Sequence, residues 1–189
     1  IEDAEERNHY ISLINHNNEL LLNIINDVLD LSKIEAGHIE LSPVWCNLSD
    51  LIDESCTECQ PNVPEGVTLK KRYPPNLIKQ DPMRIKQVLS NLISNALKNT
   101  VQGYVEISYE TTPSETRISV SDTGRGIPEE KLGIIFERFE KADSYIQGAG
   151  LGLSICIMEH MNGTIEVTST VNKGSTFTVV FPCQVRPME

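Results

Sequence analysis

The segment DPMRIKQVLSNLISNALKNT, residues 81–100, predicts the central helix of this chain. Asp81 is a suitable N-cap, and Pro82 suits the first helical position, where a missing N–H costs nothing. Apolar residues then recur at 3.6-residue spacing and predict a face that packs into a core. They are Ile85, Leu89, Leu92 and Ala96.

The opposite face of this predicted helix is polar and unusually rich in amides. Its residues are Arg84, Gln87, Asn91, Asn95 and Lys98. Asparagine is less favourable than alanine in a helix by roughly 0.7 kcal/mol. Two interpretations remain open, a solvated helix face or a row of amide and ammonium groups that faces a ligand. The second is favoured because a solvated face more often holds Glu, Lys or Ala.

Composition limits the classes of function. The chain has 189 residues, enough for one good core, and a net charge of −11, which argues against nucleic-acid binding by bulk electrostatics. A negative protein that binds phosphate needs local help from a metal or from helix N-termini. No apolar run is long enough for a membrane span. Because the chain starts at Ile1 rather than Met, we expect a piece of a longer protein. No signal peptide is visible, and we expect a cytoplasmic location, including the cytoplasmic part of an inner-membrane sensor.

The five cysteines are irregularly spaced, which favours free thiols in a reducing compartment over a disulfide framework. Cys56 and Cys59 form a single C-x-x-C. This spacing allows a zinc site, but without a second pair it favours two small residues on a helix.

Residues 2–35 contain no Pro or Gly and carry a heptad-like apolar seam. We therefore expect one long helix, roughly 50 Å if continuous, that ends at Gly37 and packs on another helix. A core helix of the same globule is the alternative.

The remaining pattern predicts short elements. We expect strands at 43–47, 67–73 and 77–80, a helix at 48–60, and two hairpins, 103–111 with 116–121 and 163–170 with 175–182. Helices are expected at 128–139 and from the end of the glycine-rich segment at Leu153 to about Met161. Residues 185–189 are expected to be a frayed tail.

Two loops carry candidate chemistry. Asp122-Thr-Gly-Arg-Gly-Ile127 follows a predicted strand, so the Asp122 carboxylate could accept hydrogen bonds from an adenine amino group or simply form an Asx turn. An aspartic-protease loop is disfavoured because only one copy exists. Gly148-Ala-Gly-Leu-Gly-Leu153 opens a helix and suits an anion, but it matches neither a Walker loop nor a dinucleotide fingerprint.

Four segments in order resemble the boxes of sensor histidine kinases, in the GHKL ATPase superfamily. They are Asn91–Thr100, Asp122–Ile127, Phe136–Phe139 and Gly148–Leu153. The resemblance implies an α/β fold, a two-layer α/β sandwich of the Bergerat type with a mixed sheet of about five strands and three helices on one face, preceded by one long α-helix. Asn99 departs from the family, which usually has an aromatic residue there.

The resemblance also implies a site. Asn95 would be the Mg²⁺ ligand and a nucleotide contact, whereas the catalytic set would be Asn91, Lys98 and Arg138. The other residues implied to bind ATP are Asp122, Gly124, Gly126, Ile127, Gly148, Gly150, Leu151, Gly152 and Thr176.

The implied function is a two-component histidine kinase that transfers the γ-phosphoryl group of ATP to a histidine absent from this sequence. Residues 1–38 would be the second helix of the dimerisation hairpin, 39–185 the catalytic domain and 186–189 a linker. The expected partners are ATP with Mg²⁺, a response regulator and a second copy of the full-length protein. A docking module without kinase activity and a GHKL ATPase clamp are the alternatives. Because Asn91 stands where related ATPases have a glutamate, we expect slow hydrolysis.

Overall fold

The computed structural model describes residues 40–133, 135 and 151–187, together with scattered residues of the first part of the chain. Those scattered residues are Arg7, Tyr10, Ile11, Ile14, Asn17, Asn18, Leu21, Leu22, Ile25, Leu29 and Ser32. The chain divides into two compact units, Ile1–Glu40 and Leu41–Glu189. No helix among the described residues is both long enough and apolar enough to cross a membrane.

The described residues of the first unit, from Arg7 to Ser32, are all helical. Several of them are large apolar residues with exposed side chains, such as Ile14 and Leu22, which are 58% and 59% exposed. The continuous helix expected over residues 2–35 stays a prediction.

The second unit is built on a mixed five-stranded sheet with the order β2-β4-β5-β7-β6. Its strands are β2 (Val67–Arg72), β4 (Gly103–Thr111), β5 (Glu115–Asp122), β6 (Thr164–Thr170) and β7 (Gly174–Pro182). The β2 and β4 strands are parallel, and the other pairs are antiparallel. Both predicted hairpins are present, so the expected mixed α/β sheet is confirmed.

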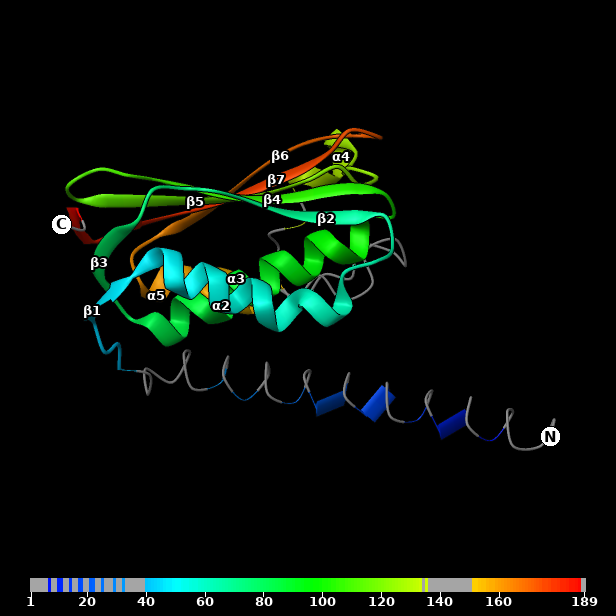
Figure 1. Ribbon diagram of the computed structural model, residues 1–189, viewed down its shortest axis with the longest axis horizontal. Coiled ribbons are helices and arrows are strands. Elements are labelled where there is room, and N and C mark those ends of the chain that lie inside the picture. Colours follow the sequence, from blue (N-terminus) through cyan, green and yellow to red (C-terminus); the bar gives the residue numbers. More distant parts are fainter. Residues whose placement is uncertain are drawn as a thin grey trace. The chain divides into compact units, whose positions relative to one another are not determined.

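Three helices lie on one face of this sheet (Figure 1). They are α2 (Leu48–Cys59), α3 (Pro82–Asn99) and α5 (Leu151–His160), and a 3₁₀ turn, η1 (Gln60–Asn62), follows α2. The apolar face predicted for α3 is buried, with Leu89 fully inaccessible. A short helix, α4 (Glu129–Leu132), lies in the region expected to be helical, but most of residues 134–150 fall outside the described part.

A second sheet of three strands was not expected. It consists of β1 (Val44–Asn47), β3 (Asn76–Gln80) and β8 (Gln184–Pro187), all antiparallel, with β3 in the middle. We expected residues 185–189 to be a frayed tail, and this was wrong for the part that the structure describes, because Gln184–Pro187 forms β8. The assignment of residues 186–189 as a linker stays a prediction. Arg186 pairs with Leu77 in the ladder, and its guanidinium lies 4.2 Å from the ring centre of Trp45. These two contacts hold Arg186 in the sheet.

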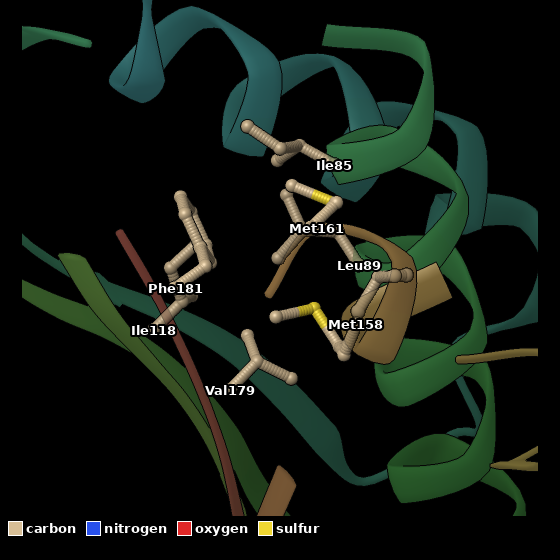
Figure 2. Close-up of a pocket in the computed structure, with 8 residues that line it drawn as sticks. Ile85, Leu89, Ile118, Met158, Met161, Val179 and Phe181 are labelled. Atoms are coloured by element: carbon tan, nitrogen blue, oxygen red, sulfur yellow. The ribbon is translucent and has the colours of Figure 1, made fainter. Parts of the chain in front are cut away.

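A small apolar cavity lies between α3, α5 and the sheet (Figure 2). Its volume is about 10 Å³, at the lower limit for one water molecule, and an apolar cavity of this size stays dry. Figure 2 shows Met158 and Met161 facing Phe181 across it. The cavity is therefore an imperfection of core packing rather than a ligand site.

Candidate functional site

Helix α3 positions the polar side chains predicted to face a ligand. Its N-terminus is fixed by Asp81, whose Oδ1 accepts hydrogen bonds from the backbone N–H groups of Met83 and Arg84 at 3.0 and 3.2 Å. The other carboxylate oxygen accepts from the N–H of Ser42 at 3.0 Å. The predicted N-cap is thus confirmed, and it also joins the helix to the chain before β1.

Asn91 contacts the helix that follows the glycine-rich segment. Its side-chain nitrogen donates to the hydroxyl of Ser154, a fully buried residue of α5, at 3.3 Å. Because Nδ2 is used in this bond, the amide oxygen is the end that points away from Ser154. Sequence reasoning did not identify Ser154 as part of the site, and only its place in the predicted helix pointed to it.

Asn95 lies one turn further along α3 and is 9% exposed. The side-chain nitrogen of Asn99 donates to its backbone oxygen at 2.8 Å and to its Oδ1 at 3.2 Å. Lys98, between them in the sequence, has an exposed side chain at the helix C-terminus. A cation is favourable there because the helix dipole is negative at that end, so exposure alone does not distinguish a phosphate ligand from an ordinary terminal lysine.

Asp122 ends β5 on the helix-covered face of the sheet and is 7% exposed. Its carboxylate accepts from the backbone N–H of Gly124 at 2.8 Å and from that of Ser175. Burial nevertheless raises the pKa of Asp122, and the two backbone hydrogen bonds only reduce that shift. The Asx turn that we considered as an alternative is present. A carboxylate has about four acceptor positions, so two bonds leave capacity for a ligand.

The glycines after Asp122 allow close backbone contacts. A Cβ atom on Gly124 would lie 2.1 Å from the carbonyl oxygen of Asn99, and one on Gly126 would lie 2.1 Å from that of Thr170. Gly126 also has a φ of +68°, a conformation that side chains rarely adopt. Next to it, the N–H of Ile127 donates to the hydroxyl of Ser169 at 2.8 Å. The loop is therefore held between the end of α3 and the hairpin of β6 and β7.

Asn99 connects the two halves of the site. In addition to its side-chain bonds to Asn95, its backbone oxygen accepts from the N–H of Arg125 at 3.3 Å. The end of α3 and the loop after β5, which the sequence predicted separately, thus meet at one residue.

The structure does not bring Thr176 to Asp122. Thr176 pairs with Ser121 in the ladder, and their hydroxyls lie 2.9 Å apart. Successive residues of a strand point to opposite faces, so Thr176 and Asp122 lie on different faces of the sheet. Ser175, which is 7% exposed, shares the face of Asp122. The alternation of apolar residues along 175–182 was the signal that could have identified it.

Several predicted residues cannot be placed. Arg138, Gly148 and Gly150 lie outside the described residues. Leu151 and Gly152 are the first residues of α5, so the helix begins inside the glycine-rich segment, earlier than the expected start after Leu153.

Cys56 and Cys59 lie on α2 and are 3% and 8% exposed. The described residues contain no group of three or more His, Cys, Asp or Glu side chains that could hold a metal. Their place on α2 and their burial are those of small residues that pack on one face of a helix.

The site combines amide groups on α3, an exposed ammonium, a buried carboxylate acceptor and a nearby helix N-terminus. Its donor set suits a magnesium ion, which prefers oxygen ligands and keeps most of its water. It also suits a base with an exocyclic amino group. Such a set defines a nucleotide-binding α/β sandwich.

Comparison with known proteins agrees with this class. Residues 80–185 match the family described as histidine kinase-, DNA gyrase B-, and HSP90-like ATPase. The circadian input-output histidine kinase CikA of Synechococcus elongatus is 37% identical over 98% of this chain. The sensor protein GacS of Pseudomonas syringae is 38% identical over 89%. The chain spans only 26% and 20% of the lengths of these two relatives.

Solved structures are also similar. Full-length ShkA in complex with AMPPNP superposes with a TM-score of 0.82 at 28% identity, covering 97% of this chain and 40% of that one. ThkA in complex with the response regulator TrrA gives 0.73 at 27% identity, covering 92% and 50%. The chain therefore belongs to the histidine kinase-, DNA gyrase B- and HSP90-like ATPase family, within which it is an ATP-binding catalytic domain of the two-component sensor kinase type.

Proposed function

We propose that residues 41–189 bind ATP with Mg²⁺ and transfer its γ-phosphoryl group to a histidine outside these 189 residues. The observation that carries the proposal is the direct connection of the amide-bearing end of α3 to the Asp122 loop through Asn99. One end of this arrangement suits a metal–phosphate group and the other suits a base. Phosphoryl transfer depends on such positioning and on charge stabilisation more than on covalent help from the protein.

Asp122 would recognise adenine. Its carboxylate can only accept hydrogen bonds when ionised, and an exocyclic amino group is a donor. The N–H groups of Gly124 and Ser175 hold the carboxylate in place without using all its acceptor positions. Gly126 and Ile127 stay in the proposed nucleotide-binding set on the resemblance, and the packing of Gly126 against the backbone of Thr170 would hold their loop beside Asp122.

Asn95 would supply the one protein ligand of Mg²⁺ through its amide oxygen, and Asn91 would contact phosphate or a metal-bound water. When bound, the ion would neutralise negative charge that develops on the transferred group. Lys98 would add a positive charge, which a chain of net charge −11 needs locally. The N-terminus of α5, at Leu151 and Gly152, would offer backbone N–H groups to phosphate. Arg138, Gly148 and Gly150 stay in the proposed set on the resemblance alone.

Hydrolysis by this site should be slow. An amide cannot take up a proton, and Asn91 stands where related ATPases of the superfamily have a glutamate that activates water. We expect Asn91→Glu to raise ATP turnover in the absence of any histidine acceptor, at least tenfold if a general base is restored. Rapid Mg²⁺-dependent hydrolysis by the unaltered chain would contradict the assignment.

Residues 1–38 would form the second helix of a dimerisation hairpin, as one long helix. The heptad-like seam and the exposed apolar side chains between Tyr10 and Leu29 support this. A response regulator would be the onward partner, as the ThkA complex with TrrA suggests by analogy. None of His9, His16, His38 and His160 lies in the sequence context of the family's acceptor histidine, so the acceptor would come from the preceding helix of the hairpin.

The test is phosphoryl transfer in trans. The chain is mixed with a separate hairpin that carries an acceptor histidine, together with γ-labelled ATP. We expect label on that histidine, lost when Asp122 is replaced by Asn. Nucleotide binding without any transfer would favour an ATPase clamp, and no nucleotide binding at all would favour a docking module.

A further inference from the structure

Asn99 is the last residue of α3, and neither the sequence pattern nor the proposed ligand set gives it a role. Its amide nitrogen donates to two acceptors of the same residue, the backbone oxygen of Asn95 at 2.8 Å and the side-chain Oδ1 at 3.2 Å. An amide nitrogen has two protons, so it can serve both contacts. The side chain of Asn99 is thereby fixed one helical turn from its partner.

The contact with Oδ1 decides which end of the Asn95 amide is oxygen. The two ends of an asparagine amide are nearly identical in shape, and only hydrogen bonding distinguishes them. A donor that faces one end favours the orientation with oxygen at that end. Asn95 is 9% exposed, so water has little access to compete for this choice.

A hydrogen bond to one lone pair does not prevent metal coordination. A carbonyl oxygen has two lone pairs, and one stays available when Asn99 donates to the other. The same bond keeps the amide nitrogen, which cannot bind a cation, on the far side of the group. The geometry therefore prepares Asn95 as an oxygen ligand before any metal arrives.

Asn99 also holds this arrangement against the base-recognition loop. Its backbone oxygen accepts from the N–H of Arg125 at 3.3 Å, and the Cα of Gly124 is so close that a Cβ there would lie 2.1 Å from the same oxygen. Gly124 in turn donates to Asp122. The residue that orients the metal ligand is thus fixed to the loop that holds the carboxylate.

We propose that Asn99 is a positioning residue for magnesium–nucleotide binding, which keeps the Asn95 side chain turned so that its oxygen serves as the metal ligand. The inference rests on the proposed function of Asn95. This positioning role explains how asparagine can replace the aromatic residue expected at position 99. The Asn99 side chain contacts the proposed metal ligand one helical turn earlier.

The test uses the ratio of nucleotide affinities with and without magnesium. Titration calorimetry of ADP against the full chain is run in excess Mg²⁺ and again in EDTA. For Asn99→Leu, which removes the donor without adding charge, we expect the magnesium-dependent gain in affinity to fall roughly three- to tenfold, the range for one neutral hydrogen bond. The affinity for ADP in EDTA should change by less than about twofold, because the hydrogen bond acts on the metal ligand. Asn99→Ala is a second variant in case the leucine perturbs folding, and Asn62→Leu in η1 is the control at an exposed site.

A double substitution separates positioning from general helix stability. In Asn95→Asp both ends of the side chain are oxygen, so no orientation has to be chosen. We therefore expect Asn99→Leu to have no further effect on the magnesium gain in that background. The proposal would be overturned if Asn99→Leu lowered the magnesium-dependent gain in ADP affinity equally in the Asn95 and Asn95→Asp chains. It would also be overturned if Asn99→Leu left this gain unchanged in the chain that keeps Asn95. If the unaltered chain binds ADP equally well with and without Mg²⁺, the proposed function of Asn95 fails instead.

Discussion

Asp122 is the residue at which function and stability oppose each other most clearly. Its carboxylate is almost inaccessible, and burial raises its pKa above the ordinary aspartate value. The folded state therefore binds this proton more tightly than the unfolded state does. The contribution of Asp122 to stability is greatest at low pH and is lost as the pH rises through the raised pKa.

Replacement by asparagine should consequently stabilise the empty domain at neutral pH while weakening nucleotide binding. We expect Asp122→Asn to unfold at a higher temperature than the unaltered chain at pH 7, with the difference shrinking as the pH is lowered. A charge-assisted hydrogen bond is worth about 1.5–3 kcal/mol, so ADP affinity should fall roughly 10- to 100-fold. Thermal unfolding across a pH series and calorimetry measure the two effects, and a less stable variant at pH 7 would contradict the sign.

Cys56 offers a second prediction at this scale. Burial raises its pKa to about 11, and only the thiolate is reactive. We expect alkylation at pH 8 to be on the order of a hundredfold slower in the native chain than in denaturant, as followed by mass spectrometry. Cys183, which is only half-buried, is the internal comparison. Equal rates for Cys56 in both states would show that α2 is not packed as described.

At the scale of elements, α3 carries the core and the site on opposite faces. Leu89 is fully buried and lines the apolar cavity between α3, α5 and the sheet. We expect Leu89→Ala to lower the free energy of unfolding by about 2–5 kcal/mol, because the existing cavity would be enlarged. Urea unfolding measures this loss. Met83→Ala, at a side chain on the same helix that is 70% exposed, should change stability by less than about 0.5 kcal/mol, and comparable losses in the two variants would contradict the packing.

The elements also indicate what the sequence alone could predict. Helix α3 was predictable because its N-cap, the helical spacing of its apolar residues and the stripe of amides on the opposite face all indicate the same two-faced helix. Strand β8 was not, because four residues carry little pattern and depend on the partner strand β3 for their conformation. The face on which Thr176 lies was not predictable, because the resemblance gave only its position in the sequence and the ladder register places it opposite Ser121. The bond from Asn99 to Asn95 was missed because hydrogen bonds between side chains leave no periodic signal.

At the scale of the whole molecule, the chain divides into two compact units, for which we propose separate roles. The second unit, Leu41–Glu189, contains both sheets, their helices and every described residue of the proposed site. We expect a protein of residues 41–189 to bind magnesium–ADP with an affinity within about twofold of the full chain, because the binding contacts are unchanged.

The first unit should instead control self-association, because exposed apolar side chains along a helix favour packing against a partner. Sedimentation analysis should detect dimers of the full chain and monomers of residues 41–189. Loss of ADP binding on removal of residues 1–40 would mean that the site extends beyond the second unit.

We propose that asparagine side chains, without an acidic ligand on α3, hold a magnesium nucleotide whose base meets a buried carboxylate. A crystal structure of the chain with Mg²⁺ and a non-hydrolysable ATP analogue would show this arrangement. We expect the ion about 2.0–2.1 Å from the side-chain oxygen of Asn95 and the adenine amino group within hydrogen-bonding distance of Asp122. An analogue bound elsewhere, or an ion held without Asn95, would contradict it.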